Sequence, residues 1–165
     1  MIQRQLTVLV VVLFWVAAQG CSATSQTESN VMRSKAVGAA GKFAGTRWSL
    51  VEIQSMDDAI GSSRPNASDL YTMDLNADGT VAMRLNCNRG WGQWIAKPLG
   101  NGESGGFRIG PLAMTRAQCQ PPSLDVRIAK DVEFVRSFIL KGGRLYLSLM
   151  ADGGIYVWEQ RGKGN

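Results

Sequence analysis

The sequence predicts an α+β domain in which a small antiparallel β-sheet, or a barrel-like meander, packs on one amphipathic α-helix. Apolar and polar residues alternate over 71–85, and several more short apolar runs are separated by glycine-rich turns, which predicts the sheet. Apolar residues recur at spacings of four, four and three between Leu124 and Val135, which predicts the helix. The pattern is compatible with an open sheet and with a closed barrel.

The first twenty residues are typical of an export signal. Arg4 precedes the uncharged run 6–18, which is shorter than the roughly 20 residues that span a bilayer as a helix. Small residues then lead into Cys21, as in the lipobox of bacterial lipoproteins, so we predict a lipoprotein signal peptide over 1–20 and lipidation of Cys21. The alternative is secretion with simple cleavage near Gly20. Because Ser22 follows Cys21, we expect an outer-membrane lipoprotein that faces the periplasm.

The rest of the chain divides into a tether, one domain and a tail. Residues 21–42 are mainly small or polar and cannot repay the entropy of ordering, so we predict a flexible tether there. Residues 43–160 have the length of a single domain, and 161–165 form a short tail.

The charge balance is mildly basic, with 18 Lys and Arg residues against 13 Asp and Glu residues and a net charge of +5. This favours anionic neighbours such as lipid head groups, but the basic residues form no continuous run. We therefore expect no nucleic-acid partner. The expected partners are the membrane, through Cys21, and a protein or small ligand of the envelope.

The most clearly predicted element is a β-hairpin over 71–85. Its two alternating runs flank Asp78-Gly79, a pair that supplies the positive φ of tight turns. The segment from Asp74 also matches the opening of a calcium loop, but Leu85 stands where the bidentate Glu belongs. We interpret the segment as a structural turn.

Further strands are predicted where short apolar runs are bounded by turn residues; these runs are 46–53, 91–95, 107–109, 138–140, 145–149 and 155–158. The helix is expected to begin after Pro121 and Pro122, with Ser123 as its N-cap. We expect its apolar stripe to cover a face or mouth of the sheet.

Two cysteines remain after Cys21, and we predict that Cys87 and Cys119 form a disulfide. An even pair in an oxidising compartment is usually bonded, although two free thiols are the alternative. The chain has no histidine, so it has neither the four nitrogen and sulfur ligands of a zinc site nor a Ser-His-Asp relay. We expect no metal, no cofactor and no enzymatic activity.

Several segments together resemble the META domain family, the HslJ-type heat-shock lipoproteins of the bacterial envelope. The resemblance rests on Asn86-Cys87-Asn88, the block 112–119 (Leu-Ala-Met-Thr-Arg-Ala-Gln-Cys), the amphipathic helix and the Gly-Gly-x-Leu-x-Leu run at 142–147. Family members usually have glycine where this chain has Asn86. The resemblance implies a barrel-like sheet plugged by a helix, no established activity, and roles in stress tolerance, ligand binding or inhibition.

The motif contributes four candidate site residues, Asn86, Asn88, Thr115 and Arg116. We expect both asparagines to form turns by bonding their own backbone. For Thr115 and Arg116 we favour a structural role, with Thr115 bonding backbone and Arg116 pairing with a carboxylate. The other possibility is that Arg116 docks a partner.

Trp91 and Trp94 lie three apart in a predicted strand and should therefore face opposite sides of the sheet. One should enter the core, and the other is a possible surface contact. The function predicted from all of this is a lipid-anchored, non-catalytic envelope domain with a stress-associated binding or structural role. The alternatives are a protease-inhibitor-like or small-ligand-binding barrel and, third, a hydrolase that uses two carboxylates.

Overall fold

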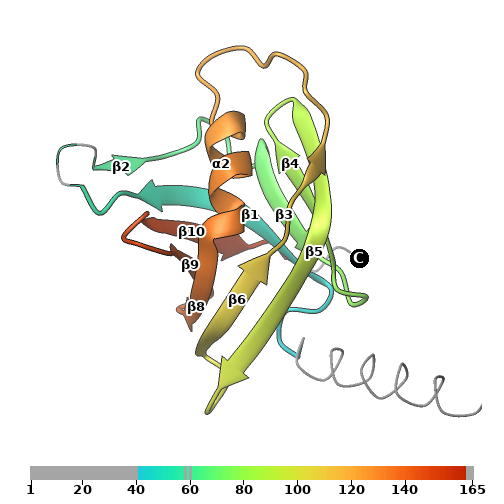
Figure 1. The fold of residues 1–165 in the computed structure, drawn as a ribbon, viewed down its shortest axis with the longest axis vertical. Coiled ribbons are helices and arrows are strands. Elements are labelled where there is room, and N and C mark those ends of the chain that lie inside the picture. Colours follow the sequence, from blue (N-terminus) through green and yellow to red (C-terminus); the bar gives the residue numbers. More distant parts are fainter. Residues whose placement is uncertain (1–40, 58, 60, 163–165) are drawn as a thin grey trace, which may run out of the picture. The chain divides into compact units, whose positions relative to one another are not determined.

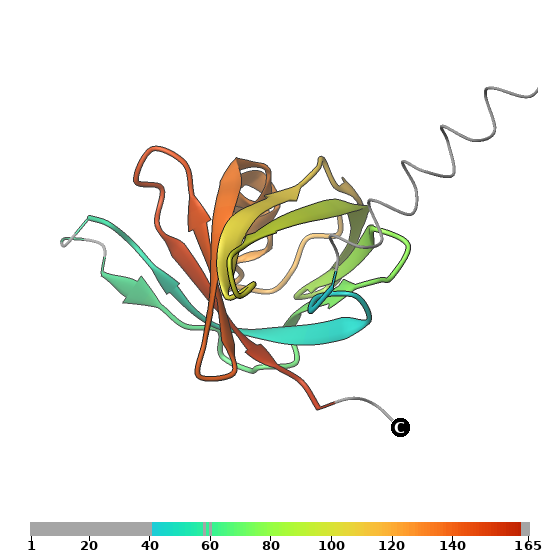
Figure 2. The same cartoon turned by 90° about the horizontal axis from the view of Figure 1, so that it is seen from below.

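The domain is an antiparallel β-barrel that closes on itself. The computed structural model describes residues 41–57, 59 and 61–162. Within them, eight strands follow one another in the order β10-β9-β8-β6-β5-β4-β3-β1, and β1 pairs with β10 to complete the ring. Figure 1 shows the barrel from the side, and Figure 2 shows the strands surrounding its interior.

The barrel strands are β1 (Thr46–Gln54), β3 (Tyr71–Leu75), β4 (Thr80–Leu85), β5 (Asn88–Leu99), β6 (Ser104–Ile109), β8 (Val135–Lys141), β9 (Arg144–Leu149) and β10 (Ile155–Gln160). Two short strands lie off this path: β2 (Ser62–Ser63) pairs with β1, and β7 (Ala113–Met114) pairs with β5. Helix α2 (Asp125–Asp131) continues into the 3-10 turn η1 (Val132–Phe134) and then into β8.

The predicted α+β class is wrong, because strands dominate the domain and α2 has only seven residues. The apolar stripe does not lie on one helix: Ile128 belongs to α2, Val132 to η1 and Val135 to β8. All three side chains are buried in the core. The apolar spacing that predicted one helix is therefore produced by a helix, a 3-10 turn and a strand in succession. The predicted cap is also absent, since Leu124 occupies the N-cap position without a side-chain hydrogen bond.

The hairpin predicted over 71–85 is confirmed, with Met73 opposite Met83 in the β3–β4 register. Its turn is held by polar contacts: the Thr80 N–H donates to Asp78 Oδ1 at 2.9 Å, and Asn76 Nδ2 donates to Thr80 Oγ1 at 2.9 Å. These contacts are those of a structural turn, as the sequence indicated.

Aromatic side chains fill the centre of the barrel. The ring of Phe43 packs edge-on against Phe138, with 4.8 Å between centroids, and against Phe107, with 5.4 Å. Trp94 stacks on Phe107 at 5.9 Å. Because each such ring buries a large apolar area and prefers offset or edge contacts, this cluster holds several strands in one arrangement.

Candidate functional site: the disulfide rim

A disulfide between Cys87 and Cys119 ties two loops together at one end of the barrel, which confirms the predicted bond. Cys87 lies in the turn between β4 and β5, and Cys119 lies in the segment that leads from β7 to α2. The bond therefore fastens that connecting segment to the barrel. We call residues 86–89, 115–119 and 123–125 the disulfide rim.

Asn88 is the centre of the rim and is only 2% exposed. Its Nδ2 donates to the Ala117 carbonyl at 2.9 Å and to Asp125 Oδ2 at 2.9 Å. Its Oδ1 accepts from the Ala117 N–H at 2.8 Å and from Thr115 Oγ1 at 2.9 Å. A side-chain amide has two donors and two acceptor sites, so the capacity of Asn88 is fully used.

A second set of contacts extends the rim to Tyr71 on β3. Ser123 Oγ donates to Asp125 Oδ1 at 2.7 Å and accepts from Asn86 Nδ2 at 2.9 Å. The Leu124 N–H donates to the Tyr71 hydroxyl at 2.9 Å. Because the start of α2 lacks a capping side chain of its own, these bonds fix where the helix begins.

Asp125 is a carboxylate buried to 7% exposure. Burial acts to raise the pKa of this carboxyl, but hydrogen bonds from Ser123 and Asn88 and from nearby backbone N–H groups outweigh it and lower the pKa. Asp125 is therefore held as a carboxylate by donors that surround it. The Asp125 carboxylate accepts these hydrogen bonds, and its role is structural.

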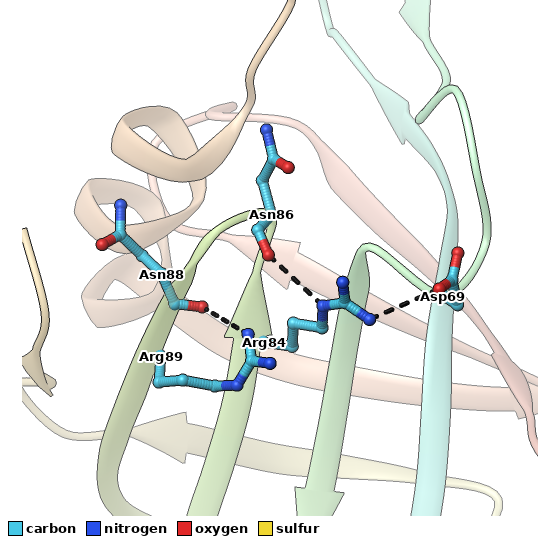
Figure 3. A network of polar contacts seen from close by, with 5 residues as sticks. All are labelled: Asp69, Arg84, Asn86, Asn88 and Arg89. Atoms are coloured by element: carbon cyan, nitrogen blue, oxygen red, sulfur yellow. Dashed lines mark hydrogen bonds and ion pairs between the residues drawn. The ribbon is translucent and has the colours of Figure 1, made fainter. Parts of the chain in front are cut away.

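The backbone at Asn86 is in the left-handed region, with φ of +59°. Asn adopts this conformation more readily than most non-glycine residues. Arg84 donates from Nε to the Asn86 carbonyl at 3.3 Å and pairs with Asp69 at 3.3 Å (Figure 3). Arg89 donates to the Asn88 carbonyl at 3.2 Å, so two guanidinium groups brace the turn that carries Cys87.

The structure corrects the expected role of Asn88, which does not bond its own backbone but joins segments 27 to 37 residues away. Asn86 does form the turn, and its side chain reaches Ser123. Thr115 bonds backbone as expected, because its Oγ1 accepts from the Arg89 N–H at 2.9 Å. Within the described ranges no ion pair involves the exposed Arg116, so the expected carboxylate partner is not found there.

Ser123 and Asp125 of the rim, and Tyr71 that bonds to it, were not predicted as site residues. Tyr71 has the pattern of a core strand residue, and an Asp in the first turn of a helix is typical of an exposed position that favours the helix dipole. Their sequence neighbourhood carries no sign of their partners, because Asp125 meets Asn88 across 37 residues.

Trp91 and Trp94 lie on opposite faces of β5, as predicted: Trp91 is 52% exposed and Trp94 is 4% exposed. The Trp94 Nε1 donates to the Asn76 carbonyl at 3.2 Å inside the domain. Only Trp91 is thus accessible as a surface contact. The contact itself stays a prediction.

The predicted signal peptide, lipidation site and most of the tether lie outside the described residues. Among the residues that are described, no helix has the length and apolar character needed to cross a membrane. Over the same residues, no group of three or more His, Cys, Asp or Glu side chains is placed to hold a metal ion.

The polar atoms at the centre of the rim bond to one another, and their geometry is that of a clamp. Asn88 has no unused hydrogen-bonding position, and the oxygens of Asp125 accept from Asn88 and Ser123. The hydrogen bonds of both side chains stay inside the domain. The chemistry of the rim is therefore positional: it fixes the shape of this end of the barrel.

Two solved structures share the fold. An NMR structure of a protein from Burkholderia xenovorans aligns with a TM-score of 0.58 and 17% identity over 76% of this chain and 88% of that one. A crystal structure of a DUF4847 family protein from Bacteroides vulgatus aligns with a TM-score of 0.52 and 12% identity over 76% of this chain and 99% of that one.

No curated protein matches the chain. The model of the META domain matches residues 41–161, which include the whole barrel and the disulfide rim. This match extends over most of the sequence. The chain belongs to the META domain family.

Proposed function

We propose that the protein is a non-catalytic envelope domain, attached to the outer membrane by a lipid on Cys21, which presents a rigid surface in a stress-associated binding or structural role. Support for the anchor comes from the uncharged run 6–18 and the small residues before Cys21. Support for the non-catalytic role comes from the disulfide rim, in which the motif residues Asn86, Asn88 and Thr115 form contacts inside the domain.

The observation that carries the proposal is the complete use of the Asn88 side chain between Thr115, Ala117 and Asp125. A buried amide that makes four hydrogen bonds to three residues makes the surrounding segments rigid. A domain whose most characteristic residues hold its own shape is suited to present a fixed outer surface.

The small-ligand alternative, with the ligand inside the barrel, receives no support. The interior positions are occupied by large side chains that include Phe43, Phe107, Phe138 and Trp158, all almost completely buried. Small barrels of eight strands either fill with side chains or hold one small ligand, and this one is filled. A protease-inhibitor-like role would need an outer loop that inserts into a protease. None of the described contacts identifies such a loop.

The proposal can be tested by labelling cells with a radioactive fatty acid and separating their membranes. The full chain should carry the label and fractionate with the outer membrane. Cys21→Ser should lose both, whereas Cys87→Ser combined with Cys119→Ser should keep the label, because only Cys21 is the predicted acceptor. A labelled Cys21→Ser protein would contradict the anchor.

The stress role needs its own measurement. Cells that lack the protein should survive a heat shock less well, and the full chain should restore survival. Cys21→Ser, expressed to the same level, should restore it poorly if the attachment matters. Equal survival of cells with and without the protein would contradict the stress-associated role.

A further inference from the structure

The outer side of β5, β6 and β8 combines exposed apolar and basic side chains without any carboxylate from these strands. None of the three strands contains Asp or Glu. We call eight of their exposed residues the basic face: Arg89, Trp91, Ile95, Lys97, Leu99, Arg108, Ile139 and Lys141. Neighbouring carboxylates are Asp69, which pairs with Arg84, and Glu103 and Glu133, which lie in the adjoining turns.

The strand geometry places these residues on one side of the sheet, with the exposed polar residues Gln93 and Ser104 among them. Residues 89, 91, 95, 97 and 99 share the outer side of β5, because side chains alternate along a strand and Trp94 and Ala96 point inward. Arg108 lies opposite Ile95 in the β5–β6 register. Leu99 pairs with Ser104, which in turn pairs with Ile139, so one row crosses three strands.

The four apolar members are each at least half exposed to solvent. At roughly 3.3 Å per residue, Trp91 and Leu99 are about 26 Å apart along β5. Exposed large apolar side chains that gather on one face favour contact with another protein or a membrane. Lys97 lies between Ile95 and Leu99, and Arg89, Arg108 and Lys141 lie on the same face, so the contact must also suit positive charge.

A hollow of about 270 Å³ opens on the same face beside Ile95. Arg108, Arg136 and Glu133 all line it, so two guanidinium groups stand against one carboxylate. The Arg136 guanidinium donates to the carbonyls of Glu133 and Val135, both at 2.8 Å, which fixes its position. Two guanidinium groups in one hollow suit the phosphate of a lipid head group, since planar forked donors match phosphate oxygens.

From these observations we propose that the basic face docks on a surface of anionic phospholipid. Trp91, Ile95, Leu99 and Ile139 would enter the boundary between head groups and acyl chains, while the basic side chains contact the phosphates. Tryptophan and aliphatic residues interleaved with Lys and Arg are the composition that binds this boundary. The absence of acidic residues from the three strands supplies the charge complementarity.

The inference rests on the proposed function for one point only, the delivery of the domain to a membrane. Twenty positions separate Cys21 from Gly41, and a chain of that length spans at most about 70 Å. A lipid at Cys21 would therefore leave the barrel within reach of the membrane that holds it. The docking itself can be measured without the anchor.

The test uses the chain from position 21 onward with Cys21→Ser, which lacks both the predicted signal segment with its apolar run 6–18 and the lipid, so that binding must come from the rest of the chain. It is mixed with vesicles of phosphatidylglycerol and phosphatidylcholine, or of phosphatidylcholine alone, and sedimented. We expect binding to the anionic vesicles that weakens as salt is added, with a blue shift of tryptophan fluorescence that Trp91→Phe removes. Absence of binding to the anionic vesicles would overturn the docking face and leave the lipid anchor untouched.

Variants then locate the contact. Lys97→Glu with Arg108→Glu should weaken anionic-vesicle binding by about tenfold or more, since each basic residue near such a surface contributes on the order of 1 kcal/mol. Ile95→Asp should act similarly. Arg47→Glu with Arg161→Glu, which changes the net charge by the same amount, and Met56→Asp are the matched controls, because these residues are exposed outside the basic face.

All variants should keep the native near-ultraviolet circular dichroism. Equal losses from Arg47→Glu with Arg161→Glu and from Lys97→Glu with Arg108→Glu would assign the binding to net charge and overturn the proposal. So would a homodimer in analytical ultracentrifugation that Ile95→Asp dissolves, since the face would then be an interface between copies of this chain.

Discussion

The side-chain amide of Asn88 donates a hydrogen bond to the carboxylate of Asp125 at 2.9 Å, which joins the first residue of β5 to the first residue of α2. The same amide holds Ala117. One side chain thus fixes the connecting segment and its downstream helix. The position of α2 depends on this contact more than on the helix propensity of its seven residues.

Removal of the disulfide should lower the free energy of unfolding substantially. For a sequence separation of 32 residues, the chain-entropy model gives about 3 to 4 kcal/mol for the Cys87–Cys119 bond. Urea denaturation of the double variant Cys87→Ser and Cys119→Ser should show this loss. Cys21→Ser is the control and should keep the parent midpoint. An unchanged midpoint in the double variant would contradict a stabilising role of the bond.

Substitutions at Asn86 should separate backbone strain from the loss of a side-chain contact. Asn86→Ala should cost about 1 to 2 kcal/mol for the left-handed φ of +59°, and it also removes the contact with Ser123. Asn86→Gly removes the same contact but fits the backbone, so it should be the more stable of the two in thermal unfolding. Equal melting temperatures would argue against strain at this turn.

Acidification should remove the stabilising contribution of Asp125. The pKa of Asp125 is lower in the folded protein than the value of about 3.9 for an exposed Asp, so folding is favoured above that value. The contribution is then lost as pH falls through the folded pKa. The pKa of Glu52 is also lowered, and its effect follows the same sign.

Comparison of the parent with Asp125→Asn isolates the Asp125 contribution, because Glu52 is present in both proteins. The difference in unfolding free energy, measured in urea from neutral pH downward, should be largest at neutral pH and shrink in acid. A difference that stayed constant with pH would show that Asp125 acts without its charge.

Trp158→Phe should cost less stability than Trp94→Phe. Both replace a buried indole by a smaller ring, but Trp94 Nε1 donates to Asn76, whereas Trp158 Nε1 is buried without a hydrogen-bond partner among the described residues. Since a hydrogen bond contributes on the order of 1 kcal/mol to stability, the two urea midpoints should differ in that direction. The reverse order would mean that the Trp158 site tolerates its polar atom well.

The local parts of this fold could be predicted from the sequence and its closure could not. The hairpin at Asp78-Gly79 follows from alternation and turn chemistry within fifteen residues or so. The pair Trp48 and Gln160, which closes the barrel, joins the two ends of the domain's sequence. Neither strand has a residue pattern that predicts which strand it pairs with. The helix was overestimated because three buried side chains on three different elements repeat at helical spacing.

The same distinction between local and distant contacts applies to the candidate site. Cys87 and Cys119 could be paired by counting cysteines, and Thr115 could be placed against backbone from its motif. Asn88 was misread because asparagine near a cysteine most often forms a local turn, whereas its partners here are distant. A contact between side chains on separate segments exists only after the chain has folded.

The pairing of β1 with β10 places the first and last strands of the barrel side by side. A short linker could therefore join their ends, and new termini could be opened in the exposed turn at Gly100 and Asn101. Such a circular permutant would keep every strand pairing of the ring but would attach the tether at a different point of the barrel. Engineering could therefore set which side of the domain faces its attachment.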